Sequence, residues 1–140
     1  CDSYGDRQLL PKRLLPVVCH RRDKALLARQ KEQCMAAARA GAVMVSARIA
    51  TGEQDIMDAI MTEGLSTVLV MDNGMGEVYH PSGQHLEQCA DGRLLLVSPW
   101  RFRYRGVDED ITVAECKAMN CVVQALCRTR DDWWKKSLFC

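Results

Sequence analysis

The sequence predicts an α/β fold, a Rossmann-like three-layer sandwich with a mostly parallel sheet. Short, continuously apolar runs alternate with amphipathic segments at helical spacing, which is typical of buried parallel strands joined by helices. Glycines at 41 and 64 follow two of the helical segments, where helices commonly end. The chain has 140 residues, of which 48% are hydrophobic, enough to bury one ordinary core.

The expected elements follow one another in a regular order. Strands are expected at residues 14–19, 42–45, 67–71 and 94–97. Helices are expected from the N-cap Asp23 to the stop at Gly41, over residues 53–63, through Leu86 and Cys89, and from about Thr112 to about Cys127. Thr112 and Glu115 have the spacing of a capping box at the start of the last helix.

These elements divide the chain into three parts. Residues 1–13 are polar and basic, with Gly5 and Pro11 as breakers, and are expected to form a loosely held N-terminal arm. Residues 14–127 form the Rossmann-like domain. Residues 128–140 are a tail whose Trp133 and Trp134 pack either on the domain or on a partner. The chain opens with Cys1 rather than methionine, so it is either processed or a piece of a longer protein.

Charge and hydropathy exclude several classes of protein. Nineteen Lys and Arg against eighteen Asp and Glu give a formal net charge of +1, so an anion site has to be local. No apolar run reaches the roughly 20 residues that span a bilayer, and no leader is seen, which favours a cytoplasmic protein without a membrane partner. Most of the eight cysteines lie in apolar segments and are expected to be reduced, buried thiols.

Ligands of an open parallel sheet bind at the carboxyl ends of its strands, where helix N-termini present free N–H groups. Four loops, at residues 19–22, 46–53, 72–76 and 98–105, are expected there. They contain Arg21, Arg22, Arg48, Arg101, Arg103 and Arg105, and guanidinium groups suit phosphate oxygens. The alternative is that these arginines are solvated and pair with acidic residues 108–110.

The predicted ligand is therefore phosphate-bearing, and each contact has an expected role. Ser46 offers a hydroxyl, and Gly52 with the following helix N-terminus offers backbone donors. The predicted phosphate-binding residues are Arg21, Arg22, Ser46, Arg48, Gly52, Asn73, Arg101 and Arg103. Phe102 and Tyr104 alternate with arginines and are expected to stack on bases. The alternative for this stretch is an edge strand or loop with its aromatic side chains turned inward.

Other chemistries find little support. Residues 46–52 lack both the Gly-x-Gly-x-x-Gly pattern of dinucleotide sites and the Gly-Lys-Ser/Thr of P-loops, so no cofactor is expected. His80, His85 and Cys89 lack the tight pairing of common metal sites and are interpreted as polar loop residues and a buried thiol. Cys19 beside His20 could be a nucleophile, but no orienting partner is identifiable. We therefore expect neither a metal site nor catalytic residues.

Several turns carry a resemblance to a known family. They are Val17-Val18-Cys19-His20-Arg21, the segment from Val43 to Glu53, Asn73-Gly74-Met75-Gly76-Glu77-Val78-Tyr79-His80-Pro81, and Leu94-Leu95-Leu96-Val97-Ser98-Pro99. In this order they resemble the successive turns of the DNA-processing protein A (DprA/Smf) family over roughly residues 14–127. The resemblance implies a Rossmann-like domain that grips single-stranded DNA at the carboxyl edge of its sheet and recruits a recombinase.

The departures from that family bear on function. The family's Arg-Asn-Arg at the start of its last core helix falls near Met119-Asn120-Cys121, where only the asparagine matches. The missing arginines put both DNA binding and recruitment in question. The Pro-Gly-Gly-x-Gly-Thr-x-x-Glu of the related lonely-guy-type nucleotide phosphoribohydrolases is absent, which disfavours that enzymatic branch.

Three functions remain open. The preferred one is non-catalytic binding of a phosphate-bearing ligand, single-stranded DNA first, in a DNA-processing context. The second is an enzyme or sensor that binds a small nucleotide in the same cleft, with Glu53 or Asp72 as acid or base. The third is a ligand-free scaffold that assembles through the Trp133 and Trp134 tail. A homo-oligomer is compatible with each of them.

Overall fold

A five-stranded sheet forms the centre of the molecule. The computed structural model describes residues 2–19, 24–71, 84–99, 112–130 and 133–136. The strands are β1 (Asp2–Gly5), β2 (Leu14–Pro16), β3 (Val43–Ser46), β4 (Thr67–Val70) and β5 (Leu94–Ser98). They lie side by side in the order β1-β5-β4-β3-β2. Strands β2 to β5 are parallel, and β1 pairs antiparallel with β5.

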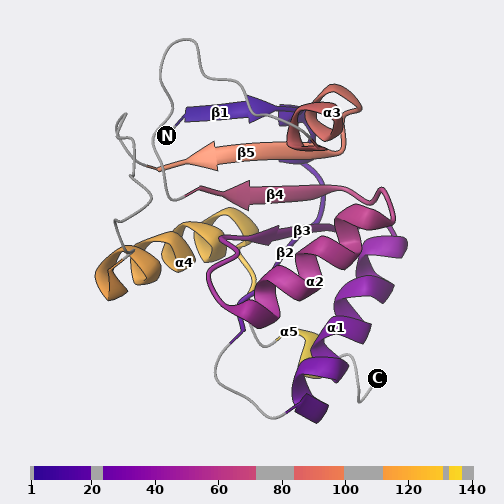
Figure 1. Ribbon diagram of the computed structural model, residues 1–140, viewed down its shortest axis with the longest axis vertical. Helices are drawn as coiled ribbons and strands as arrows, with labels where there is room; N and C mark the ends of the chain where they lie inside the picture. The colour runs from indigo at the N-terminus through magenta and orange to yellow at the C-terminus, as the bar shows by residue number, and fades with distance from the viewer. Residues whose placement is uncertain (1, 20–23, 72–83, 100–111, 131–132, 137–140) are drawn as a thin grey trace.

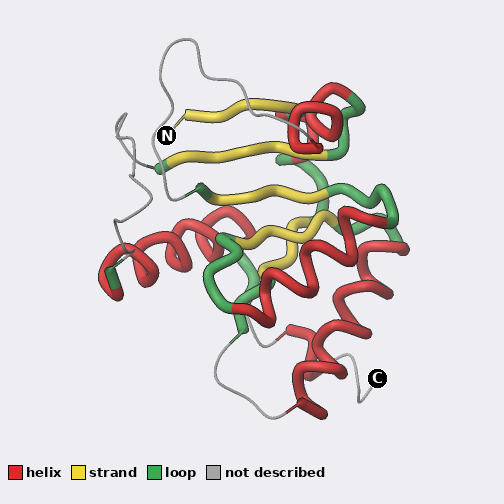
Figure 2. Tube along the Cα trace, in the orientation of Figure 1, coloured by secondary structure: helices red, strands yellow, loops and turns green. Residues whose placement is uncertain are grey.

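Helices cover both faces of the sheet. They are the short η1 (Arg7–Leu9), α1 (Lys24–Arg39), α2 (Thr51–Thr62), α3 (Gln84–Ala90), α4 (Val113–Cys127) and α5 (Trp133–Lys136). Because β2 to β5 follow one another across the sheet, right-handed crossovers place α1, α2 and α3 on the same face. α4 lies against the opposite face (Figures 1 and 2). The predicted Rossmann-like sandwich is confirmed.

The strands are buried on both sides, which explains their continuous apolar sequence. One core cluster joins Met44, Leu69 and Leu96 to Cys34 of α1 and Ile60 of α2. The other joins the alternate strand residues to α4. Its members include Val45, Val68, Val70, Leu95, Val97, Met119 and Val123. Residues next to each other along a strand thus belong to different clusters, as the pleat requires.

Three predicted helix ends agree with the structure, whereas the predicted N-cap Asp23 lies outside the described residues. Gly41 and Gly64 have φ of +105° and +76°, left-handed conformations that glycine adopts without strain. At the start of α4, Thr112 Oγ1 accepts from the Glu115 N–H at 3.1 Å, and Glu115 Oε1 accepts from the Thr112 N–H at 3.2 Å. The capping box is therefore confirmed.

The expectation of a loose N-terminal arm is wrong for residues 2–9. β1 pairs with β5, the Asp6 N–H donates to the Leu94 carbonyl at 3.2 Å, and Leu9 is only 1% exposed. The polar composition misled the prediction because β1 is an edge strand, and its pairing with residues some ninety positions away leaves no local pattern.

The two tryptophans of the tail pack on the domain. Trp134 is fully buried, and Trp133 Nε1 donates to the Pro16 carbonyl oxygen at 2.8 Å. α5 lies against α1. These two tryptophans therefore do not form the exposed apolar patch that the scaffold function needs.

The described cysteines, residues 19, 34, 89, 116, 121 and 127, are all free thiols. Burial raises the pKa of Cys34 and of Cys127 to about 12. Cys121, in the apolar sequence of α4, does not follow the expected burial of the cysteines, because its thiol is exposed. The buried side of α4 is set by Met119, Val123 and Cys127, and a residue two positions after Met119 points away from it. No helix within the described ranges has the length and hydropathy to cross a bilayer.

Candidate functional site

The carboxyl ends of the four parallel strands meet at one edge of the sheet, on the left of Figure 1. The first turn of α2 begins at the same edge, directly after Ser46 and the loop that follows β3. Seven of the predicted site residues lie outside the described residues and stay predictions. They are Arg21, Arg22, Asn73, Arg101, Phe102, Arg103 and Tyr104. The structure thus places Ser46, Arg48 and Gly52.

Ser46 and Arg48 form a tight turn. The Ser46 Oγ accepts from the Arg48 N–H at 3.0 Å, and Arg48 has a φ of 53°, which is uncommon for a residue with a side chain. Gln54 Nε2 donates to the Arg48 carbonyl oxygen at 3.1 Å. Ser46 is fully buried, so its hydroxyl positions Arg48 and does not face solvent in this conformation.

The Arg48 guanidinium makes one ion pair and also contains a buried N–H donor. It donates through Nη2 to Asp58 Oδ1 of α2 at 2.6 Å, with 31% of its side chain exposed. Its Nε is buried and has no hydrogen-bond partner in the described part of the chain. A buried N–H without an acceptor is costly, so this donor is suited to an acceptor atom of a ligand.

Gly52 is explained by packing. A Cβ at this position would lie 3.1 Å from Leu27 Cδ2 and 3.3 Å from Cys19 Sγ, so the glycine lets the first turn of α2 approach both residues closely. Its predicted role as a backbone donor to phosphate stays a prediction.

The N-terminus of α2 already holds a carboxylate. Glu53 is 2% exposed, and its Oε2 accepts from the Ala50 N–H at 2.8 Å. A carboxylate at this end of a helix is favoured by the helix dipole. Glu53 is therefore a capping residue in this structure. The other acid or base candidate, Asp72, lies outside the described residues.

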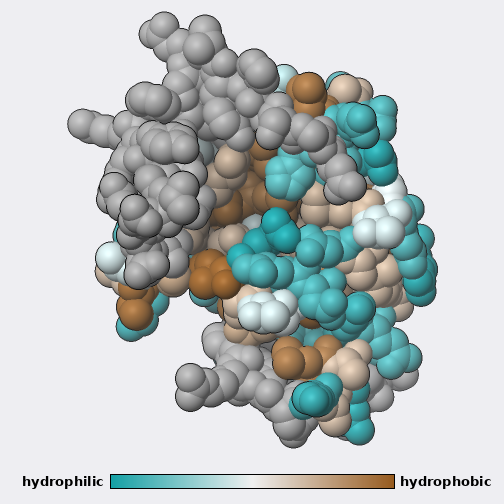
Figure 3. Space-filling model, in the orientation of Figure 1, coloured by the Kyte–Doolittle hydropathy of each residue, from teal (hydrophilic) through white to brown (hydrophobic). Residues whose placement is uncertain are grey.

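Two adjoining cavities open beside Arg48. One, of about 390 Å³, lies at the carboxyl edge and reaches from the loop after β3 to Met119 of α4. The other, of about 650 Å³, runs between α2 and α3. Arg48 and His85 line both cavities. Figure 3 shows hydrophobic atoms recessed over the middle of the sheet, with hydrophilic atoms on the side of α2.

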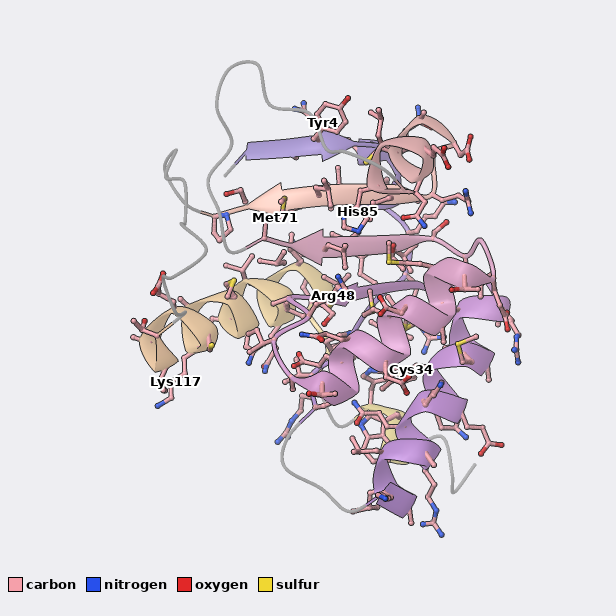
Figure 4. The ribbon with its side chains drawn as sticks, in the orientation of Figure 1. Tyr4, Cys34, Arg48, Met71, His85 and Lys117 are labelled. Atoms are coloured by element: carbon pink, nitrogen blue, oxygen red, sulfur yellow. The ribbon has the colours of Figure 1, made fainter. Side chains whose placement is uncertain are left out.

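His85 is the main site residue that the sequence did not predict. It lies in the first turn of α3 and not in a loop, and faces the same cavities as Arg48 (Figure 4). Burial lowers the pKa of His85, the Arg48 charge lowers it further, and Asp58 acts in the opposite direction. The imidazole is therefore mainly neutral at pH 7 and can both donate and accept. The only sequence signal was its place at the start of a helix that follows a parallel strand.

The described structure gives little support to the other candidate residues, which are the possible nucleophile Cys19 and the possible metal ligands. The Cys19 Sγ donates to Gln30 Oε1 at 3.5 Å, and Gln30 donates to the Val18 carbonyl oxygen at 3.2 Å, so this thiol takes part in a structural contact. His80 lies outside the described residues. Across the residues that the structure describes, no three His, Cys, Asp or Glu side chains are grouped to hold a metal ion.

Comparison with known proteins gives one solved structure of similar fold. It is DNA processing protein A from Helicobacter pylori, in a study of its single-stranded DNA binding mode, with a TM-score of 0.61 and 17% sequence identity. The match covers 89% of this chain and 55% of that one, so this chain spans about half the length of that structure. No protein-family model and no curated protein matches the sequence. The likeness confirms a distant DprA-like fold.

Proposed function

We propose that this chain binds single-stranded DNA at the carboxyl edge of its sheet, without chemical transformation of the strand. The observation that carries the proposal is Arg48. The Ser46 hydroxyl and the Gln54 amide hold its backbone in a left-handed turn at this edge, and its Nε is an unused buried donor within the described ranges. A guanidinium held in this way is preorganised for a phosphate or another oxygen acceptor.

The neighbouring segments supply further positive charge in the sequence. The chain leaves the ends of β2 and β5 at the edge that holds Arg48. The residues that follow include Arg21 and Arg22 after β2, and Arg101 to Arg105 with two interleaved aromatic residues after β5. Arginines hold phosphates and aromatic rings stack on bases in single-strand sites. The fold likeness to a DNA processing protein A that is described as binding single-stranded DNA supports the same function.

A second candidate is the binding of a small nucleotide, as in a sensor or an enzyme. The cavity of about 390 Å³ beside Arg48 favours it, because small-molecule sites usually measure about 300–1,000 Å³. The capping role of Glu53 weakens the enzyme form of this candidate, so single-stranded DNA remains the preferred ligand.

Fluorescence anisotropy of a labelled single-stranded oligonucleotide tests the proposal. We expect binding that weakens steeply between low and moderate salt, with a slope of about −0.7 per phosphate contact. The double variant Arg48→Asn with Arg101→Ala should bind at least about tenfold more weakly and with a shallower slope. Asparagine suits position 48 because it tolerates a left-handed backbone.

Arg39→Gln is the matched control. Arg39 lies at the last turn of α1 and pairs with Glu63, as Arg48 pairs with Asp58, but it does not line either cavity. It should leave binding unchanged. AMP and ADP-ribose serve as unlabelled competitors. No binding of the oligonucleotide at low salt would overturn the proposal, and tight binding of AMP in that case would establish the second candidate.

A further inference from the structure

The two cavities beside Arg48 form one amphipathic groove over β4 and β5. They share Arg48 from the loop after β3 and His85 from α3, and Figure 4 shows these two residues on opposite sides of the space over β4. Both volumes, about 390 and 650 Å³, lie within the range of small-molecule sites. A ligand in this groove therefore meets two different environments, one on each side of the Arg48 and His85 pair.

The described lining of the first cavity consists mostly of apolar residues, while polar and apolar atoms contribute similar shares of its surface. Its walls are formed by Ile49, Leu69, Val70, Met71, Leu96 and Met119. Among the described lining residues, Arg48, Gln54 and His85 contribute polar side chains. Aliphatic and methionine side chains around a few polar groups suit a flat heteroaromatic ring, which loses its apolar faces to the protein and keeps hydrogen bonds at its edge.

The second cavity is polar, but its charges are largely balanced. Arg48 pairs with Asp58, and Arg93 pairs with Asp91 at 2.9 Å. Glu87 adds a carboxylate to the lining, and it has no ion pair with the described residues. Among the described lining residues, each cation already has an acidic partner, and Glu87 would repel an anionic group. The cavity therefore favours a neutral, hydrogen-bonding ligand over a phosphate.

The wall of this second cavity contains a buried acceptor. Gln88 of α3 is 9% exposed and lines the cavity, and its Oε1 is buried without a hydrogen-bond partner in the described structure. The Arg48 Nε is a buried donor in the same condition. The Thr62 hydroxyl already donates to the Asp58 carbonyl oxygen at 2.7 Å. A buried amide oxygen and a buried guanidinium N–H together favour a ligand that both donates and accepts hydrogen bonds, as adjacent hydroxyl groups do.

We propose that the groove between α2 and α3 binds a nucleoside, with the base in the apolar cavity and the sugar hydroxyls in the polar cavity. A sugar hydroxyl donates to Gln88 Oε1, another accepts from Arg48 Nε, and the base edge meets His85 and Gln54. The nucleoside is either a free small molecule or the terminal unit of a strand. The site goes beyond the proposed strand binding, because it shares only Arg48 with the phosphate contacts.

Isothermal titration calorimetry with adenosine, guanosine, cytidine, uridine and thymidine tests this site. We expect at least one nucleoside to bind with a dissociation constant below about 1 mM. The matching free base and ribose should each bind at least about tenfold more weakly than the nucleoside, because each fills one cavity. The 5′-monophosphate should bind no more tightly than the nucleoside, because the described cations of the polar cavity, Arg48 and Arg93, are already paired with carboxylates.

Gln88→Leu separates binding from folding. It removes the buried amide oxygen and keeps the side-chain size, so the melting temperature should stay the same or rise, while nucleoside affinity falls about tenfold or more. Gln124→Leu on the exposed side of α4 is the matched control and should leave affinity unchanged. A Gln88→Leu protein that binds as the wild type does would overturn the site, as would the absence of binding by all five nucleosides.

The sources of the nucleoside are separated by oligonucleotides with free or blocked terminal hydroxyls. If a terminal unit occupies the groove, blocking lowers strand affinity in the wild type and has no effect in Gln88→Leu. If a free nucleoside is the ligand, blocking has no effect in either protein. Failure of strand binding alone, with Gln88-dependent nucleoside binding intact, would overturn the proposed function and leave this site standing.

Discussion

His85 lies where burial and a guanidinium act on the same imidazole. Its ordinary pKa near 6.5 is lowered by desolvation and by the Arg48 charge, with Asp58 opposing. Glu87 and Arg93 line the same cavity. Below pH 6.5 the unfolded chain therefore binds more protons at this site than the folded chain does, so the site lowers the free energy of unfolding as the pH falls. Stability linked to His85 is present at neutral pH and is lost on acidification.

His85→Gln should reduce this pH dependence. The free energy of unfolding of the wild type, minus that of the variant, should be smaller at pH 5 than at pH 7. Urea denaturation of both proteins at the two pH values measures this difference in free energy of unfolding. Carboxylates that titrate in both proteins contribute equally and cancel in the subtraction. A difference that grows as the pH falls would contradict the lowered pKa.

Single residues also show what the sequence could not reveal about the site. The rule that ligands bind at the carboxyl ends of parallel strands selected Ser46 and Arg48 correctly as edge residues. It could not reveal that Ser46 serves the turn of Arg48, nor that Asp58, His85 and Gln88 converge on one groove. Their convergence depends on how α3 lies over β5 relative to α2, which is a tertiary property without a local pattern.

At the scale of elements, β1 depends on one glycine. Gly5 has a φ of +119°, and a Cβ there would overlap the Leu94 carbonyl oxygen and lie 3.0 Å from Cys89 Sγ. That carbonyl accepts from the Asp6 N–H, so a side chain at position 5 would disturb both the backbone and the link between β1 and β5.

Gly5→Ala should therefore lower the free energy of unfolding by more than the conformational cost alone. Gly41→Ala is the control, because Gly41 has a similar φ of +105° but no atom within 4 Å of the point where a Cβ would lie. Gly41→Ala should cost about 1 kcal/mol, and Gly5→Ala about 1–3 kcal/mol more. Urea denaturation measures both changes in the free energy of unfolding. Equal decreases in the two variants would show that β1 accommodates a side chain at position 5 without strain.

The elements differ in how well local sequence predicts them. Strands β2 to β5 are buried on both faces, so each is a continuous apolar run that can be recognised alone. Their helices end at glycines or begin at a capping box for reasons that are also local. β1 carries polar residues at the sheet edge, and its assignment rests on pairing with β5, which only the assembled sheet provides.

At the scale of the whole molecule, the C-terminal tryptophans connect the tail to the first part of the fold. Trp134 is fully buried, α5 packs on α1, and Trp133 Nε1 donates to the carbonyl oxygen of Pro16 in β2. α5 thus covers the side of the domain formed by α1 and β2.

Trp134→Ala should lower the free energy of unfolding by about 3–5 kcal/mol, because it empties a large buried site. Trp133→Phe keeps most of the ring and removes one hydrogen bond, so it should cost only about 1 kcal/mol. Denaturation followed by far-ultraviolet circular dichroism measures both without relying on tryptophan fluorescence. If the tail were a docking segment for a partner, Trp134→Ala would leave stability unchanged. If Trp134 belongs to the core, the variant destabilises the whole domain. Binding of the oligonucleotide and of the nucleoside then weakens only in proportion to the unfolded fraction.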